Sequence, residues 1–163
     1  MPGCGKTYWG ASLATYLSRP FVDLDSYIES SEKSTIANLF HRLGEAGFRS
    51  LEHQYLHTAV EGSTGNTIIA CGGGTPCFHS NLDFMKNNGC VIYLRAPISW
   101  LCAHLENEHT RPLLQGVKEL RSFLQNLYES RKDTYEKAHR ILDATTVSLT
   151  IFEQTILSCT DRP

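Results

Sequence analysis

The sequence predicts an α/β domain in three layers, with a parallel sheet covered by helices on both faces. Short, continuously apolar runs are typical of buried strands, and the segments between them carry apolar residues at helical spacing. Strands that alternate with helices favour a parallel sheet. The length of 163 residues fits a single domain spanning 1–163. At that length roughly 70% of the surface of the unfolded chain can be buried.

The first third of the chain predicts one strand and three helical segments. Residues 5–18 place Trp9, Leu13 and Leu17 on one helical face. Residues 20–25 predict a short strand that ends in acidic residues. A helix capped by Ser34 is expected to end at Gly44, and a further helix follows through Ala59. The other expected strands are at 67–71, 90–94 and 140–149, and the other expected helices are at 80–89, 98–107, 117–138 and 150–159. Ser80 and Asp83 resemble a capping box at the start of the helix 80–89, and Gly89 closes it.

Composition and charge narrow the class of protein. Hydrophobic residues make up 41% of the chain, which fits a globular protein and excludes a disordered one. The net charge of −2 argues against nucleic-acid binding, which requires clustered cations. The sequence has no apolar run near the ~18 residues that span a membrane and no basic-then-apolar leader. We therefore expect a cytoplasmic protein that binds neither membrane nor nucleic acid.

Six cysteines and a pair of histidines raise the question of disulfides and metal sites. No two cysteines form a C-x-x-C pair, and most lie in apolar stretches, so we expect buried, reduced thiols. His53 and His57 are four residues apart on a predicted helix, the spacing of a metal-binding pair. A third ligand is not nearby in the sequence, and we expect no metal there.

A phosphate-binding loop is predicted at the start of the chain. Residues 3–7 read Gly-Cys-Gly-Lys-Thr, and with the two residues before them they match the last seven positions of G-x-x-x-x-G-K-[ST]. Gly3 and Gly5 allow the backbone to direct several N–H groups at one anion. Lys6 can reach the β- and γ-phosphates of a nucleotide, and the Thr7 hydroxyl can bind Mg²⁺. The loop, which also includes Cys4, predicts nucleotide binding.

The strand that normally feeds such a loop is missing from the sequence. The first glycine of the motif would stand five positions before Gly5, ahead of Met1. Without that strand, two strand edges and an apolar groove would be exposed. We therefore expect a five-stranded sheet whose first strand, with roughly eight residues, is absent because the chain begins at an internal methionine. The alternative is a sheet completed by another segment or chain.

Carboxylates at the end of the strand expected at 20–25 are candidates for chemistry. Asp23 and Asp25 are two residues apart, so on a strand they project to the same side. They stand at the carboxyl end, where open α/β sheets bind ligands. One could hold Mg²⁺ through water, and the other could orient a hydroxyl or accept its proton. The alternative is a pair of solvated acids.

Three further features concern anion binding. Arg49 and Glu52 are three residues apart on one helix and form either a functional pair or a solvated surface pair. The run Gly72–Gly74 suits a backbone that must approach a ligand closely. Arg131 stands in an apolar stripe with Leu127 and Tyr135, where a guanidinium either meets an anion or extends its charge to the surface.

Together these motifs resemble the shikimate kinases, which belong to the nucleoside-monophosphate-kinase-like group of P-loop proteins. The resemblance covers nearly the whole chain and implies the three-layer P-loop NTPase fold. The motifs that carry it appear in the family's order. These motifs are Gly3 to Thr7, Asp23-Leu24-Asp25, Gly44-Glu45 followed by Phe48-Arg49 and Glu52, Gly72 to Gly74, Arg111-Pro112-Leu113-Leu114, and Arg131 with Tyr135.

The resemblance implies roles on the acceptor side of the reaction. Asp25 would bind the shikimate hydroxyls and favour attack by the 3-hydroxyl on the γ-phosphate. Arg49 and Arg131 would grip the shikimate carboxylate through charge-assisted hydrogen bonds, and Glu52 would orient Arg49. The backbone of Gly72, Gly73 and Gly74 would lie against the ring.

The resemblance also implies a substrate pocket and a lid. Residues 34–61 would form the shikimate-binding helices, with Phe40 and Phe48 as apolar walls. Arg111, within a lid at 108–116, would fold over ATP and neutralise charge in the transition state.

On the nucleotide side the resemblance implies that Lys6 acts in catalysis with Asp25 and Arg111. Thr7 and Asp23 would serve Mg²⁺. The arginine that relatives often place before the lid motif is absent from residues 104–110, where His104 or His109 could stack on adenine instead. The loop at 143–146 also lacks the arginine that some relatives carry.

The function that follows is the ATP-dependent phosphorylation of shikimate to 3-phosphoshikimate, a step toward chorismate and the aromatic amino acids. The expected partners are ATP and shikimate, and a monomer is expected. One alternative is a related small-molecule kinase such as a gluconate kinase, which the glycine run and the Phe48-Arg49-x-x-Glu52 set argue against. Another is a binding module without turnover, which intact Lys6, Asp25 and Arg111 oppose.

Overall fold

The computed structural model describes residues 1–106 and 119–160. The predicted lid at 108–116, with Arg111 and His109, lies outside the described residues. The elements in chain order are α1 (Lys6–Tyr16), β1 (Phe21–Asp23), α2 (Leu24–Glu32), α3 (Ile36–Glu61), β2 (Ile68–Ala70), the 3₁₀ helix η1 (Thr75–Cys77), α4 (Asn81–Asn88), β3 (Ile92–Arg95), α5 (Ile98–Leu105), α6 (Leu120–Tyr135), β4 (Arg140–Asp143) and α7 (Leu149–Thr160).

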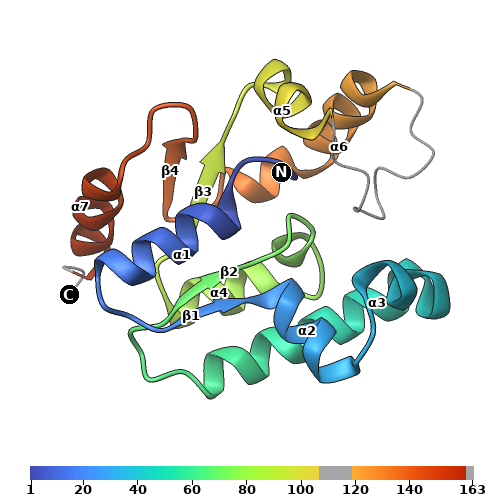
Figure 1. Ribbon diagram of the computed structural model, residues 1–163, viewed down its shortest axis with the longest axis horizontal. Helices are drawn as coiled ribbons and strands as arrows, with labels where there is room; N and C mark the ends of the chain where they lie inside the picture. The colour runs from blue at the N-terminus through green and yellow to red at the C-terminus, as the bar shows by residue number, and fades with distance from the viewer. Residues whose placement is uncertain (107–118, 161–163) are drawn as a thin grey trace.

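The four strands of the described residues form two separate parallel pairs (Figure 1). In one pair β1 lies beside β2, with Asp23 opposite Ala70. In the other β3 lies beside β4, with Arg95 opposite Asp143. The α/β class with parallel strands is therefore confirmed. Because β1 and β2 end side by side, the residues that follow them, Asp25 and Gly72, are brought to one edge.

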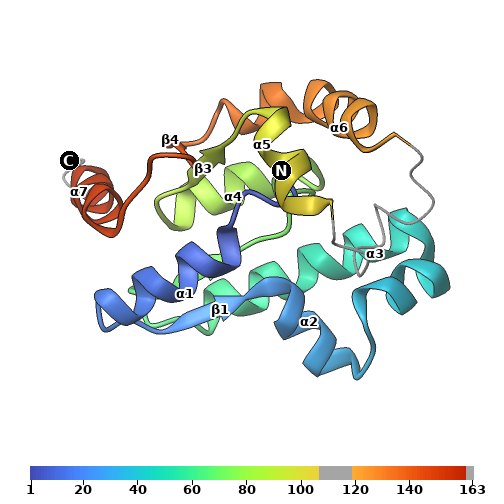
Figure 2. The same cartoon turned by 45° about the horizontal axis from the view of Figure 1, so that its top comes forward.

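Each strand pair has its own hydrophobic core. The β1–β2 pair lies with α2 and α3, and the β3–β4 pair lies with α5 and α6 in the two views of Figures 1 and 2. The smaller core is Leu24, Ile28, Leu39, Phe48 and Leu56, all nearly inaccessible to solvent. The larger core joins α1 to β3 and to helices α5, α6 and α7 through residues that include Leu13, Leu94, Leu101, Leu124 and Phe152.

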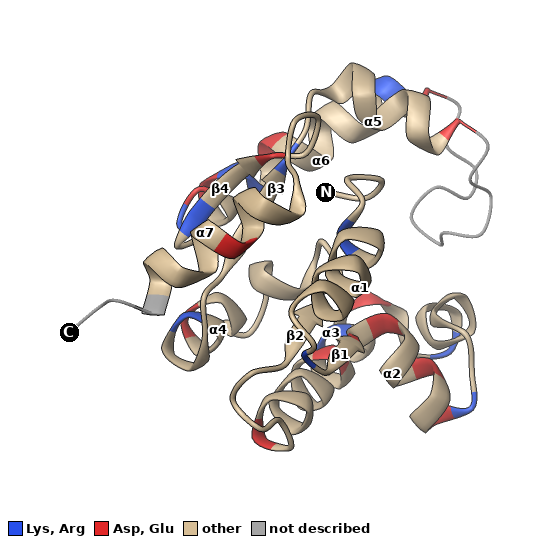
Figure 3. Cartoon of the chain, turned by 60° about the vertical axis from the view of Figure 1, so that its left-hand side comes forward, with Lys and Arg blue, Asp and Glu red and all other residues tan. Residues whose placement is uncertain are grey.

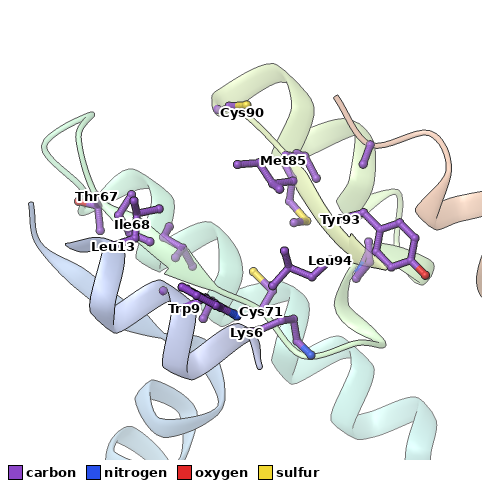
Figure 4. A pocket seen from close by; sticks show the side chains of 18 of the residues that line it. Lys6, Trp9, Leu13, Thr67, Ile68, Cys71, Met85, Cys90, Tyr93 and Leu94 are labelled. Carbon is purple, nitrogen blue, oxygen red and sulfur yellow. The ribbon is translucent and has the colours of Figure 1, made fainter. Parts of the chain in front are cut away.

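A largely apolar cavity of about 420 Å³ runs between the two strand pairs (Figure 4). Ile68 of β2 and Leu94 of β3 line it from opposite sides, and Trp9 and Leu13 line it from α1. Lys6 stands at its polar end. The sequence predicted five strands with the first one missing. The described residues contain four strands, and the cavity separates the two pairs.

Two sequence predictions about the first third of the chain were wrong in detail. The strand expected at 20–25 ends at Asp23, whose carboxylate accepts a hydrogen bond from Ser26 N and caps α2. The helix α2 was not predicted. The helix expected to start at Ser34 is instead capped by Thr35, and the predicted break at Gly44 is confirmed by its left-handed backbone, with φ 67°.

Two predictions about later residues were also wrong. Ser80 precedes α4, but it adopts φ 54° and its side chain makes no capping bond, so the expected capping box is not formed. Cys90 and Cys159 form a disulfide that ties the start of β3 to α7, although all six cysteines were predicted to be reduced. The sequence around the two residues gave no sign of this pairing, because the bond joins positions 69 residues apart. In the described residues, no helix is long and apolar enough to cross a membrane.

Candidate active site

The phosphate loop turns through two glycines with left-handed backbones. Gly3 has φ 76° and Gly5, which precedes α1, has φ 82°, a conformation that other residues rarely adopt. A Cβ atom on Gly3 would also lie 2.7 Å from Leu105 Cγ. Lys6 Nζ reaches back over the loop and donates a hydrogen bond to the Met1 carbonyl oxygen at 2.8 Å. Among the described residues, no side chain caps the start of α1, so its N–H groups suit an anion.

Thr7 and Asp23 form a pair of oxygen ligands beside this loop. The Thr7 hydroxyl donates a hydrogen bond of 2.6 Å to Asp23 Oδ2. Hydroxyl and carboxylate oxygens are the ligands that Mg²⁺ accepts, usually together with water and substrate phosphates. Figure 3 shows acidic residues gathered on α2, which follows Asp23, near the start of α1. The pair predicted from the sequence is therefore brought together by the fold, and its chemistry fits a magnesium ion.

Asp25 reaches the site from a helix. It lies in the first turn of α2, so the prediction that it shares a strand with Asp23 was wrong. The helix begins directly after β1, and this places Asp25 Oδ1 3.2 Å from where a Cβ atom on Gly72 would be. The carboxylate therefore stands at the end of β2, on the edge where the sequence placed it.

Arg49 and Glu52 form a buried ion pair. Arg49 Nη1 donates a hydrogen bond to Glu52 Oε2 at 2.8 Å, and the two residues are 3% and 1% exposed. The surface-pair alternative is thereby excluded. Glu52 Oε1 accepts a second bond of 2.6 Å from the Thr75 hydroxyl. Arg49 Nη2 also lies 3.3 Å from Glu45 Oε1, which is largely exposed.

Three aromatic rings surround the guanidinium of Arg49. Its Cζ lies 5.4 Å from the ring centres of Phe40 and Phe48 and 4.8 Å from that of Phe78. Such distances allow cation–π attraction. Phe40 and Phe48, predicted as pocket walls, stack on each other with centres 4.2 Å apart. Phe78 was not singled out from the sequence, which offers no signal for it beyond its position after the glycine run.

The glycines 72–74 allow charged side chains to approach the backbone. A Cβ atom on Gly74 would lie 2.5 Å from Arg49 Cζ, and one on Gly72 would lie 3.0 Å from Glu52 Oε1. These glycines have no positive φ, so close approach is the reason for them. The prediction that the run meets a ligand is untested, but its neighbours are the expected ligand-binding residues.

Arg131 and Tyr135 approach the same loop from α6. Arg131 is 7% exposed, and the Tyr135 hydroxyl donates a hydrogen bond of 2.7 Å to the carbonyl oxygen of Gly73. Burial raises the pKa of Cys77, whereas the charges of Arg131 and Arg49 both lower it. The charges of both guanidinium groups therefore act on one thiol, that of Cys77, which follows the glycine run.

Cys71 connects the acceptor residues to the phosphate loop. Burial, together with the charges of Glu52 and Asp25, raises the pKa of Cys71 to about 12, and the charge of Lys6 opposes this rise. Figure 4 shows the Cys71 and Lys6 side chains near each other at the polar end of the cavity. The predicted catalytic lysine and the predicted acceptor carboxylates thus lie around one short segment that follows β2.

Other predicted contacts of the nucleotide are only partly described. His104, proposed to stack on adenine, stacks on Trp100 with ring centres 3.6 Å apart.

The histidine pair considered for metal binding lies on α3. His53 and His57 have ring centres 4.4 Å apart, but the described residues contain no group of three or more side chains able to hold a metal.

Comparisons with known proteins identify relatives of this site and fold. The family model for shikimate kinase matches residues 2–160. Shikimate kinase of Parabacteroides distasonis is 39% identical over 145 residues, which is 87% of this chain and 83% of the relative. Shikimate kinase 2 of Escherichia coli is 43% identical over 147 residues, 88% of this chain and 82% of the relative.

Solved structures of shikimate kinases are also similar to this chain. The crystal structure of shikimate kinase from Bacteroides thetaiotaomicron has a TM-score of 0.85 and 36% identity, and the match covers 99% of this chain and 93% of that one. Shikimate kinase from Acinetobacter baumannii in complex with shikimate has a TM-score of 0.86 and 32% identity, with 97% and 87% of the two chains covered.

Proposed function

The chain belongs to the shikimate kinase family, and we propose that the residues described above carry out the family's reaction. The reaction transfers the γ-phosphoryl group of ATP to the 3-hydroxyl of shikimate and yields 3-phosphoshikimate and ADP, on the way to chorismate and the aromatic amino acids. One arrangement supports the residue assignment: the buried Arg49 lies against Gly74, and Asp25 lies at Gly72 of the same loop. The buried Arg131 stands one turn of α6 before Tyr135, whose hydroxyl donates a hydrogen bond to Gly73 of that loop.

Binding of the acceptor follows from the two arginines. The shikimate carboxylate would lie between Arg49 and Arg131, because a buried guanidinium is stabilised by an anion and binds it through paired hydrogen bonds. Glu52 holds Arg49 from behind through the 2.8 Å bond. The backbone at 72–74 supports the ring. These contacts would orient the 3-hydroxyl toward the phosphate loop.

Phosphoryl transfer then needs a base and neutralisation of charge. Asp25 would accept the proton of the shikimate 3-hydroxyl. As it does so, the hydroxyl oxygen would bond to the γ-phosphorus, and the bond between that phosphorus and the bridging oxygen of ADP would break. Lys6, with the N–H groups of the loop, would stabilise the charge on the β- and γ-phosphates. Arg111, outside the described residues, would contribute from the lid at 108–116.

Magnesium would be held at the Thr7 and Asp23 oxygens, with water completing its shell. Bound there, the ion would neutralise phosphate charge during transfer. Because every residue assigned here belongs to one chain, a monomer suffices for the reaction. The requirement for ATP favours a cytoplasmic location.

A coupled assay of ADP release tests the function. Release should depend on shikimate and Mg²⁺, and gluconate and nucleoside monophosphates should not replace shikimate. The named relatives do not favour the gluconate kinase and binding-module alternatives. ADP release with gluconate alone would support the first. Calorimetric binding of shikimate without any ADP release would support the second.

A further inference from the structure

A chain of buried hydrogen bonds runs from Arg49 through Glu52 and Thr75 to Asn81. Arg49 Nη1 donates to Glu52 Oε2 at 2.8 Å, the Thr75 hydroxyl donates to Glu52 Oε1 at 2.6 Å, and Asn81 Nδ2 donates to the Thr75 carbonyl oxygen at 2.8 Å. Thr75 and Asn81 are both 0% exposed. Leaving a buried polar group unpaired costs free energy, so these bonds depend on one another.

The chain fixes the carboxylate of Glu52 at both oxygens. One oxygen binds Arg49 and the other binds Thr75, so the carboxylate cannot rotate without leaving a buried group unpaired. Arg49 Nε, in contrast, has no hydrogen-bond partner among the described residues, although it is buried. The guanidinium is therefore held by Glu52 at Nη1 and by Glu45 at Nη2, while Nε keeps an N–H for an anion.

Asn81 also ties the loop to α3 at a second point. Its Oδ1 lies 2.6 Å from Nδ1 of His53, the residue after Glu52. Because Asn81 Nδ2 donates to Thr75, Oδ1 is the acceptor, and His53 carries its hydrogen on Nδ1. Two adjacent residues of α3 are thus bonded to the segment that follows the glycine run. These two bonds hold α3, and with it Arg49, in place relative to the backbone at 72–74.

We propose that Thr75 and Asn81 are positioning residues for the shikimate carboxylate, acting through Glu52 on Arg49. The inference rests on the proposed function, since it takes the carboxylate as the ligand of Arg49. Neither residue touches the reacting atoms. Their loss should therefore weaken binding of the carboxylate and leave the nucleotide side unaffected.

Steady-state kinetics of Thr75→Val test the proposal, because valine preserves the shape and removes the hydroxyl. The KM for shikimate should rise about 10-fold, since one buried acceptor of Glu52 is left unpaired. The KM for ATP should stay within about 2-fold of the parent value, because Thr75 makes no bond to the phosphate loop. Thr75→Ser restores the hydroxyl and should restore the KM. Thr58→Val, on an exposed turn of α3, is the matched control and should change nothing.

A substrate analogue separates positioning from a general structural effect. The carboxamide of shikimate lacks the charge, so the parent protein should prefer shikimate to it, and Thr75→Val should reduce that preference. Asn81→Leu should reduce it too. If Thr75→Val folds poorly, Thr75→Ala compared with Thr75→Ser gives the same contrast on the folded fraction.

Two results would overturn the proposal while leaving the function intact: an unchanged preference in Thr75→Val, or an equal rise in the KM values for shikimate and ATP. Absence of shikimate-dependent ADP release from the parent protein would instead refute the proposed function.

Discussion

The proposed acceptor side and the proposed phosphate side of the site hold their charged groups in different ways. On the acceptor side, Arg49, Glu52 and Arg131 are all at most 7% exposed, and the first two are bonded to each other. On the phosphate side, Thr7 and Asp23 meet through one exposed hydrogen bond, and Lys6 binds a backbone carbonyl. The acceptor side therefore has its charged groups in place before substrate binds.

The difference follows from what each side must recognise. A small carboxylate offers few contacts, so affinity depends on guanidinium groups that are already oriented. A nucleotide triphosphate brings several charges, and backbone N–H groups with Mg²⁺ can meet them in a more open setting. Substitutions on the two sides should accordingly change different quantities.

The largest effect is expected at the point where the sides meet. Asp25→Asn should lower kcat by about 10²- to 10⁴-fold, the range that general-base catalysis contributes. ATP binding should change little, because the side chain keeps its size and faces the end of β2. Rapid-quench or coupled ADP assays measure kcat, and calorimetry measures the ATP affinity. An unchanged kcat would remove Asp25 from the mechanism.

The buried ion pair should dominate stability on the acceptor side. Glu52→Ala should lower the free energy of unfolding by about 3–5 kcal/mol, because it removes the buried partner of Arg49 and leaves only the exposed Glu45 at 3.3 Å. The surface pair Lys132–Glu129, 2.6 Å apart, provides the control. Lys132→Ala should cost under about 1 kcal/mol. Urea unfolding measures both, and equal losses would contradict the contrast between buried and exposed charges.

The disulfide lies apart from both sides and should affect stability alone. Replacing Cys90 and Cys159 by serine opens a loop with a sequence separation of 69 residues. The chain-entropy argument gives a loss of about 4 kcal/mol in the free energy of unfolding for a loop of this length. The KM for shikimate should be unchanged. Unfolding of the parent protein with and without reductant provides the check, and a protein equally stable in both conditions would show that the bond contributes nothing.

A smaller and more selective effect is expected from the second arginine. Arg131→Ala should raise the KM for shikimate about 10- to 100-fold, the value of a charge-assisted hydrogen bond. The KM for ATP should stay near the parent value. Lys132→Ala, the next residue of α6, removes an exposed cation as a control. If Arg131→Ala raised the KM for ATP alone, the guanidinium would belong to the phosphate side.

The sequence predicted most of the fold, because its strongest signals are local. Apolar runs identified the segments of all four strands, and Gly44 marked the break in α3. The start of α2 was missed because Asp23-Leu24-Asp25 fits the end of a strand as well as the cap of a helix. The Cys90–Cys159 bond was missed because tertiary structure alone brings these residues together.

The sequence predicted those site residues that belong to a recognisable motif. It missed the residues that contact the site only through a neighbouring side chain. Arg131 stood out as a cation in an apolar stripe, and it is buried there, while its contact with an anion stays a prediction. Thr75 and Asn81 carry no such signal, since threonine and asparagine are ordinary loop residues. Their importance depends on bonds to Glu52 and His53, which only the folded structure reveals.

A crystal structure of this chain with shikimate and ADP is the most direct test of how the acceptor is held. We predict the carboxylate within hydrogen-bond distance of both Arg49 and Arg131, with the 3-hydroxyl facing Asp25. A shikimate bound elsewhere, with its carboxylate in solvent and either arginine turned away from it, would contradict the account.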